Sequence, residues 1–191
     1  MCQDLPASRT LWMTLAFAVT LLATGGQAAE PTRVTASTPV QLALFDPAQV
    51  FDSERSVRGF RYSLFWGLNQ DVSGLDISTL GNGANGTVRG VQWALLLNLV
   101  EQDFRGYQSA LIVNRVGGDF SGYQGAMVNA TMGDFRGLQL ACFGNDTRGH
   151  MRGVQLGLVN SAKDLKGLQL GLFNVNEDGF LPFFPVFNFG F

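Results

Sequence analysis

The sequence predicts an all-β fold in which a short strand-forming unit repeats in tandem, as a β-solenoid of 14–16-residue units. The first observation is compositional, because 24 of the 191 residues are glycine. The second is that eight of these glycines recur every 14 to 16 residues: Gly59, Gly74, Gly90, Gly106, Gly122, Gly137, Gly153 and Gly167. The third is that apolar residues after each glycine alternate with small or polar ones, which is the period of a β-strand.

Each copy follows the same order of residue types around its glycine. The residue two positions before the glycine is apolar, and the residue one position before it is basic in six copies. The residue two positions after it is Gln in the last six copies, whereas the first two have Arg61 and Asp76. An Asn follows seven or eight residues after the glycine in these six copies. Such literal repetition is typical of solenoids, in which each coil packs only on its neighbours.

Two arrangements of these copies are compatible with the sequence. In a β-solenoid the glycine, or the small residue four positions later, forms a corner, since glycine tolerates a positive φ. Equivalent residues then stack about 4.8 Å apart, so that Gln and Asn side chains form ladders. The alternative is a closed up-and-down antiparallel β-barrel of about ten strands in the outer membrane. Its apolar residues would face lipid, and Arg61 and Asp76 would form an ion pair in the lumen. The uniformly short connections favour the solenoid, because such barrels alternate short turns with long loops.

The chain divides into four segments. Residues 1–28 have a basic start, an apolar run and a small-residue end, which is typical of a removable secretory signal peptide. Residues 29–56 form an N-terminal segment with a short strand at 40–45. Residues 57–179 contain the eight-copy repeat domain, and residues 180–191 are a Phe- and Pro-rich C-terminal strand or cap.

Three features of the chain carry a resemblance to a bacterial family: the segment Val40–Phe45, the tandem repeats, and the ending Gly179–Phe191. With these the chain resembles the exported surface repeat-containing proteins, over nearly all of its length after the signal. That family carries no established biochemical activity. The resemblance implies an address in the bacterial envelope, at the cell surface or outer membrane, with the periplasm as an alternative.

The composition narrows the functional classes. A net charge of −2 argues against a nucleic-acid partner, because no basic excess exists to neutralise phosphates. The chain has one His and two Cys, and no residue pattern typical of a catalytic centre. We therefore expect no enzymatic activity, no cofactor and no metal site, but a structural or binding scaffold at the cell surface. The alternative function is a small outer-membrane barrel that acts as a pore or anchor. The partner is not identified by the sequence, and the outer membrane or a surface ligand are the candidates.

Single residues outside the repeat pattern give further expectations. His150 is expected to be a solvated turn residue. Cys142 aligns with Leu158 and Leu172 of other copies, so it is expected to be a small core residue. The glycine-rich segment 81–86 is expected to be a turn.

A row of aspartates precedes most of the repeat glycines by three residues. A calcium site would need six to eight oxygen ligands, so neutralisation by the cation two residues later is the expected role. The row consists of Asp71, Asp103, Asp119, Asp134 and Asp164. Tyr107 and Tyr123 occupy the same position in adjacent copies, which makes an exposed aromatic strip one interpretation and core packing or a membrane-interface belt another.

Overall fold

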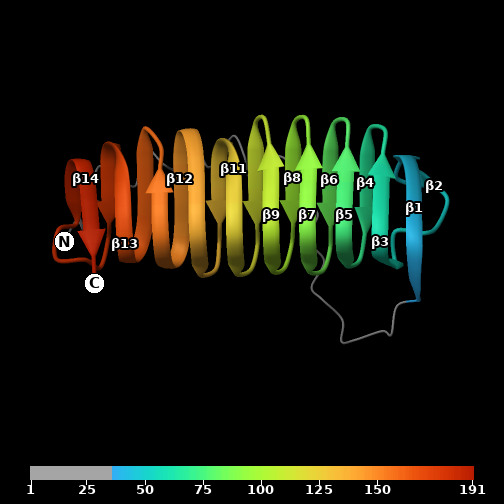
Figure 1. The fold of residues 1–191 in the computed structure, drawn as a ribbon, viewed down its shortest axis with the longest axis horizontal. Coiled ribbons are helices and arrows are strands. Elements are labelled where there is room, and N and C mark those ends of the chain that lie inside the picture. Colours follow the sequence, from blue (N-terminus) through green and yellow to red (C-terminus); the bar gives the residue numbers. More distant parts are fainter. Residues whose placement is uncertain (1–35) are drawn as a thin grey trace, which may run out of the picture. The chain divides into compact units, whose positions relative to one another are not determined.

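Successive copies of the repeat stack as parallel coils of a β-solenoid (Figure 1). The structure, a computed structural model, describes residues 36–191, so the predicted signal peptide at 1–28 lies outside the described residues. Equivalent residues of neighbouring coils pair in register, as Gly106 does with Gly122 and Gln108 with Gln124. The predicted solenoid is therefore confirmed. The antiparallel barrel is wrong, because further corners in each copy return the chain to its starting side and make neighbouring copies parallel.

The strands of residues 36–191 form one 14-stranded sheet that follows the coils. They are β1 (Ser37–Phe45), β2 (Ala48–Gln49), β3 (Ser56–Ser63), β4 (Trp66–Asn69), β5 (Val72–Ser78), β6 (Gly81–Ala84), β7 (Val88–Ala94), β8 (Leu97–Val100), β9 (Phe104–Ala110), β10 (Val113–Val116), β11 (Phe120–Thr131), β12 (Phe135–Leu156), β13 (Val159–Asn176) and β14 (Phe183–Gly190). Within this range no helix has the length and hydrophobicity of a membrane span.

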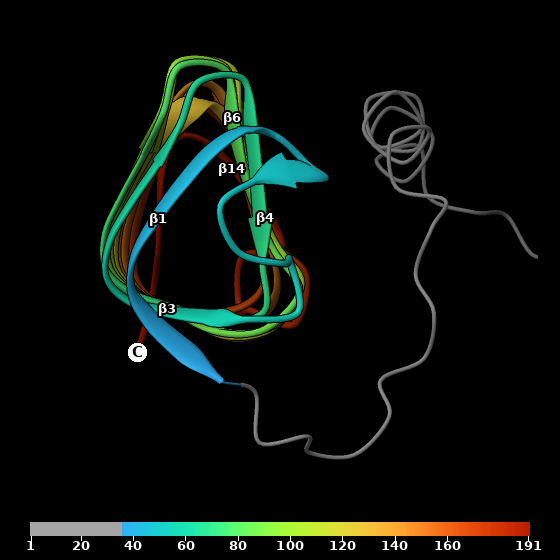
Figure 2. The ribbon, with the colours of Figure 1, turned by 90° about the vertical axis from the view of Figure 1, so that its right-hand side faces the viewer.

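Most coils combine a longer strand, which bends at its glycine, with a shorter strand. From β3 to β10 the two strands of a coil are separate, whereas β11, β12 and β13 run through the corners without a break. Viewed along the solenoid, the coils superpose in one closed outline (Figure 2). The eight repeat glycines have φ between 125° and 147°, which L residues with a Cβ rarely adopt. The predicted glycine corner is therefore present in every coil.

Two ladders of side-chain amides run through the interior. In the Gln ladder, from Gln92 to Gln169, each Nε2 donates to the Oε1 of the preceding coil at 2.7–2.9 Å. In the Asn ladder, from Asn82 to Asn174, each Nδ2 donates to the Oδ1 of the following coil at 2.9–3.0 Å. All of these side chains are fully buried. The two ladders therefore have opposite hydrogen-bond polarity.

One apolar column accompanies the ladders, formed by the residues two positions before the glycines. Its members are at most 2% exposed: Val57, Val72, Val88, Phe104, Phe120, Phe135, Met151 and Leu165. The rings of Phe104, Phe120 and Phe135 stack at centroid distances of 5.0 and 4.8 Å. The interior thus combines this column, the amide ladders and small residues with further buried apolar residues, which are Ala84, Val100, Val116 and Ala162.

A buried ion pair begins the Gln ladder. Arg61 donates from Nε and Nη2 to the two carboxylate oxygens of Asp76, both at 2.6 Å, and both side chains are 0% exposed. Gln92 donates to Asp76 at 2.9 Å, which attaches the ladder to the pair. Arg61 also donates to Asn69 and to the carbonyl of Gly83. The predicted pairing of Arg61 with Asp76 is confirmed, although it lies in a filled solenoid rather than a lumen.

Different strands cover the two ends of the coil stack. At the first end β1 pairs in parallel with β3, and its Gln41 occupies the ladder position beside Arg61. The Gln41 amide is satisfied by the backbone of Phe51, which follows β2. At the other end β14 pairs antiparallel with β13, and Asn188 lies opposite Gln169.

The segment 81–86 does not form the predicted turn. Its residues 81–84 are the buried strand β6, and only the last two residues lie outside it. A Cβ at Gly81 would lie 2.5 Å from the Trp66 ring, and one at Gly83 would lie 3.0 Å from the same ring. Gly81 and Gly83 therefore leave room for the Trp66 ring of the preceding coil and are not turn residues.

We expect Gly122→Ala to lower the free energy of unfolding by about 3 kcal/mol or more, from backbone strain and overpacking. Gly122 has φ 132°, and a new Cβ would collide with the carbonyl oxygen of Gly106. Urea denaturation followed by circular dichroism measures the loss. Ser121→Ala, one residue away and exposed, is the control and should change stability by less than about 0.5 kcal/mol. Equal effects of the two variants would contradict the corner role.

We expect Asp76→Gln to destabilise the protein by about 3–5 kcal/mol, because it leaves the buried Arg61 charge without its partner. The double variant Arg61→Gln/Asp76→Gln extends the Gln ladder by two amides and should recover at least half of that loss. Thermal and urea unfolding of the two single variants and the double variant measure the coupling. Additive losses in the double variant would show that the ladder cannot extend through these positions.

Candidate functional site

The outer surface that follows the corner glycines is apolar in every coil. Residues one, three and five positions after each glycine point outward, because they alternate with the buried Gln and small residues. We call this set the apolar face. It comprises Phe60, Tyr62, Leu64, Leu75, Ile77, Thr79, Val91, Trp93, Leu95, Tyr107, Ser109, Leu111, Tyr123, Gly125, Met127, Leu138, Leu140, Cys142, Val154, Leu156, Leu158, Leu168, Leu170 and Leu172.

The end strands continue the apolar face. In β1, Val40 pairs with Phe60 and Leu42 with Tyr62, which places both in the same outward columns. In β14, Phe189 pairs with Leu168 and Phe187 with Leu170. All four of these added residues are exposed. The face therefore extends across β1, the eight coils and β14.

The size of the apolar face is unusual for a protein surface. Ten strands about 4.8 Å apart and about five residues wide, at about 3.3 Å per residue, give an area of roughly 800 Å². The largest apolar patch on a typical monomer is about 300–600 Å² and often functional. No charged residue interrupts the face within residues 36–191, and Trp93 and Leu140 keep 44% and 41% of their surfaces exposed. This surface is the candidate functional site.

Two tyrosines form the predicted aromatic strip near the centre of the face. The Tyr107 and Tyr123 rings stack with centroids 4.7 Å apart, and Tyr107 is exposed. A Cβ at Gly125 would contact the Tyr123 ring, so this ring lies over the glycine of its own strand. Burial, together with neighbouring Tyr107, raises the pKa of the Tyr123 hydroxyl above 10. The strip is therefore part of the outer surface and not of the core.

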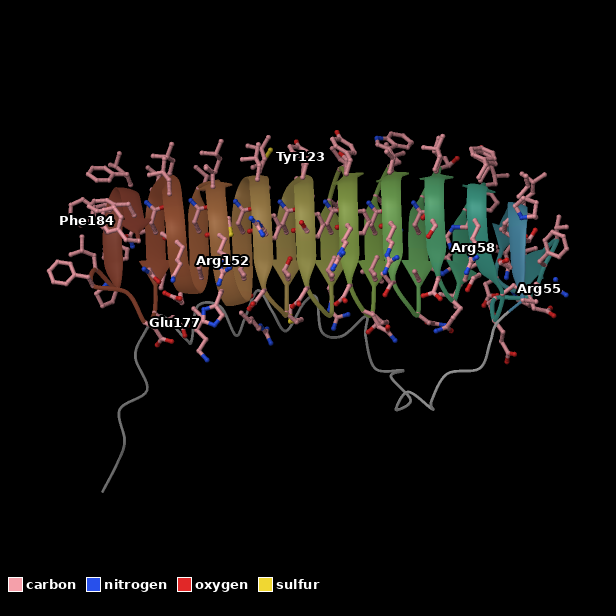
Figure 3. All side chains as sticks on the ribbon, turned by 60° about the horizontal axis from the view of Figure 1, so that its bottom comes forward. Arg55, Arg58, Tyr123, Arg152, Glu177 and Phe184 are labelled. Carbon is pink, nitrogen blue, oxygen red and sulfur yellow. The ribbon has the colours of Figure 1, made fainter. Side chains whose placement is uncertain are left out.

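A row of cations runs along one edge of the apolar face. These residues precede the corner glycines by one position, so only the glycine separates them from the face. The basic row consists of Arg58, Arg89, Arg105, Arg136, Arg152 and Lys166, and all six are exposed. Figure 3 shows Arg58 and Arg152 on one side of the coil stack and Tyr123 along another edge of it. None of the ion pairs found in residues 36–191 includes a member of this row.

The aspartate row has a different role from the one expected. The Oδ1 atoms of Asp71, Asp103, Asp119 and Asp134 accept hydrogen bonds at 2.8–2.9 Å from backbone amides one coil later. Ion pairs with the cations two residues later are absent from the described range. The neutralisation hypothesis is therefore wrong, since these carboxylates join one corner to the next. No cluster of three or more His, Cys, Asp or Glu residues suited to a metal occurs within 36–191.

The two remaining single-residue expectations have different outcomes. Cys142 is exposed on the apolar face, so the prediction that it is a core residue is wrong. Its aligned residues Leu158 and Leu172 are exposed as well. His150 is exposed as expected, but it lies within strand β12 and not in a turn, and its Nδ1 lies 2.9 Å from Oδ2 of Asp164.

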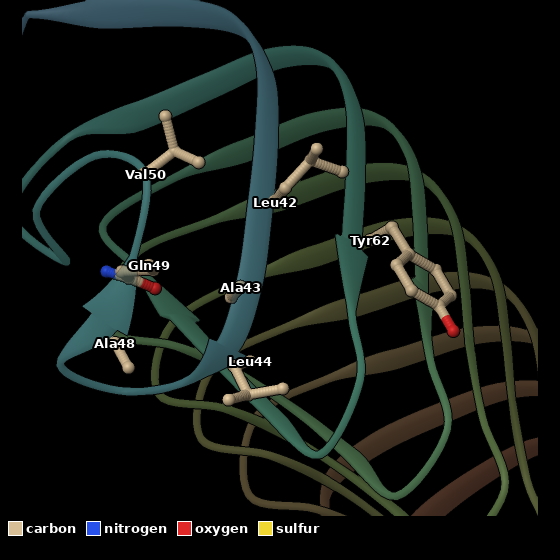
Figure 4. A pocket seen from close by; sticks show the side chains of 7 residues that line it. All are labelled: Leu42, Ala43, Leu44, Ala48, Gln49, Val50 and Tyr62. Carbon is tan, nitrogen blue, oxygen red and sulfur yellow. The ribbon is translucent and has the colours of Figure 1, made fainter.

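An open apolar hollow of about 560 Å³ lies at the β1 end of the solenoid. Its walls come from β1, β2 and Tyr62 of β3 (Figure 4). Leu42 and Tyr62 line it and also belong to one column of the apolar face. The hollow is therefore the end of that face.

The sequence alone does not assign the apolar face to the outside of a solenoid. The signal that finds it is the alternation itself. If the Gln and the small residue that follow each glycine at two and four positions are inside, the apolar residues between them must lie on the outside. Comparison of the chain with protein-family models, with characterised proteins and with solved structures gives no match. The interpretation of the face therefore depends on its own chemistry.

Asp146, on the outer side of β12, is expected to make the free energy of unfolding depend on pH. Burial raises the pKa of this carboxyl above 3.8, and nearby Arg148 opposes the shift. Because folding disfavours the charged form, stability falls as the pH rises from the unfolded pKa through the folded one. We expect Asp146→Asn to raise the free energy of unfolding at pH 7 and to leave it unchanged at pH 3, as measured by urea denaturation. Glu54→Gln, at an exposed site, is the control. A loss of stability at pH 7 would mean that the Arg148 contact outweighs burial.

Proposed function

We propose that the protein is a non-enzymatic, exported scaffold of the bacterial cell envelope that works by binding a partner through its apolar face. The observation that carries this proposal is the uncharged apolar surface that continues across β1, all eight coils and β14. Contiguous apolar patches of this size mark interaction sites in soluble proteins.

The construction of the coil supports a scaffold role. In most coils the buried positions are occupied by Gln, Asn, one or two apolar side chains and small residues, so the outward apolar residues are not needed to fill the interior. Their retention in coil after coil is best explained by contact with something outside the chain. The regular stack also holds these residues in straight columns, which suits an extended partner surface.

The address in the envelope has a separate basis. The sequence of residues 1–28 is typical of a secretory signal, and the chain resembles exported surface repeat-containing proteins. An apolar face of this size would promote aggregation if it stayed uncovered in solution. A partner at the envelope would cover it.

We expect Trp93→Glu/Leu140→Glu to abolish association of the full chain with the envelope fraction of the bacterium that produces it. Both side chains are exposed near the middle of the face, so two charges there oppose burial against a partner. Fractionation followed by immunoblotting measures the association. Asn85→Glu/Gln102→Glu adds the same two charges at exposed positions outside the face and is the matched control.

One outcome of this fractionation would contradict the proposal. If the face variant stays in the envelope fraction to the same extent as the control, the apolar face is not the binding surface. Thermal unfolding of both variants must remain close to the unsubstituted protein, because the test assumes an intact solenoid.

A further inference from the structure

We infer that the surface covered by the apolar face is a lipid layer with anionic head groups, on which the solenoid lies lengthwise. This inference rests on the proposed function and names the partner of the same face. Four observations support it: the absence of charge on the face, the adjacent basic row, the aromatic side chains, and the poor fit of the face to a second copy.

The apolar face has the composition of a surface that enters hydrocarbon. Its columns hold aliphatic and aromatic residues with only Ser109, Thr79 and Gly125 as small or polar members of the described coils. Their side chains are held in straight columns by an in-register stack, so many of them can meet a flat layer at once. Interfacial proteins bury such a face by about 5–10 Å at the boundary of head groups and acyl chains.

The basic row supplies the complementary charge. It lies two residues from the first column of the face, and the cations repeat from coil to coil about 4.8 Å apart where they are adjacent. Long Arg and Lys side chains can reach the head groups while their stems lie along apolar surface. Arg89 and Arg105 stand on adjacent coils, as do Arg136 and Arg152. A row of phosphates at the edge of a lipid layer would pair with all of these cations.

The aromatic residues have the chemistry of the layer boundary. Tyr62, Trp93 and Tyr107 are exposed on the face and combine an apolar ring with a polar hydrogen-bonding group. Trp and Tyr are enriched at the level of lipid head groups for this reason.

A second copy of the chain fits the same face less well. The area of roughly 800 Å² is similar to the ~800 Å² per partner of a standard stable interface, so the charges beside the face, and not its area, decide against a second copy. A two-fold axis across the solenoid would place the basic row of one copy against that of the other. A two-fold axis along the solenoid would place each row over an uncharged edge. The aspartates that could neutralise the cations lie at a different corner and already accept backbone amides. An anionic lipid surface satisfies the basic row, whereas a second copy does not.

The test uses the exported protein purified from its host and two kinds of vesicle, phosphatidylcholine alone and phosphatidylcholine with phosphatidylglycerol. We expect flotation with both, with tighter binding to the anionic vesicles that weakens as salt is added. Tryptophan fluorescence should be quenched by brominated acyl chains, and Trp66→Phe should keep most of that quenching because Trp93 is the tryptophan on the face.

Two charge variants separate the basic row from general electrostatics. Arg89→Gln/Arg105→Gln/Arg136→Gln should weaken binding to the anionic vesicles about a hundredfold, at about fivefold for each cation, and should leave binding to neutral vesicles unchanged. Arg55→Gln/Arg115→Gln/Arg148→Gln removes the same charge away from the row and should lower the affinity by far less. Equal losses in the two variants would overturn the assignment of the row.

Other outcomes decide between the lipid inference and the proposed function. If the protein floats with neither vesicle, the lipid inference is wrong. Sedimentation equilibrium then tests for a second copy, which Trp93→Glu/Leu140→Glu would dissociate. If that variant still loses envelope association, the face binds another envelope component and the proposed function stands. If the variant keeps envelope association, the proposed function itself fails.

Discussion

The constraint on which this structure depends is that each buried amide within the two ladders must meet its equivalent in a neighbouring coil. A Gln or Asn inside a protein costs free energy unless its donors and acceptors are paired. Here the pairing partner is the same residue one coil away, as Gln124 shows between Gln108 and Gln139. A shift of the register by one residue would unpair both ladders and turn the apolar face inward. Coil length, corner position and strand direction are all fixed by this requirement.

The same constraint explains why the outer surface is apolar. Because amides, buried apolar side chains and small residues fill the interior, the opposite side of each strand has no packing role there. In an ordinary water-exposed solenoid polar residues would occupy this outer side, yet the columns that contain Trp93 and Leu140 are apolar. The charged groups are collected at the corners, where Asp119 and Asp134 hold neighbouring turns together. Three parts of the coil thus have three roles. The interior pairs amides, the charged corners join neighbouring coils, and the remaining face is available for contact with a partner.

Much of the fold could be predicted from the sequence, because its repeat is literal. The corner glycines, the two ladders and the pairing of Arg61 with Asp76 all follow from residue type and spacing. The burial of Cys142 was wrongly predicted, because alternation defines two faces without saying which is inside, and apolar residues are buried in most proteins. The role of the aspartates was missed because their hydrogen-bond acceptors serve amides 15 or 16 residues later, which local spacing does not reveal. The turn prediction for segment 81–86 was wrong for a similar reason, since its glycines accommodate Trp66 of another coil.

The opposed polarity of the two ladders has a consequence for how such a chain can grow. Each amide row is a line of aligned dipoles, and a single row would accumulate an end-to-end dipole with every added coil. Because the Gln row donates toward β1 and the Asn row toward β14, their dipoles largely cancel at any length. Asp76, which accepts only, fixes the direction of the Gln row at one end, and the coils between Gln92 and Gln169 are interchangeable in this respect. Duplication or loss of a middle coil would therefore change the length of the apolar face without altering the electrostatics of either end.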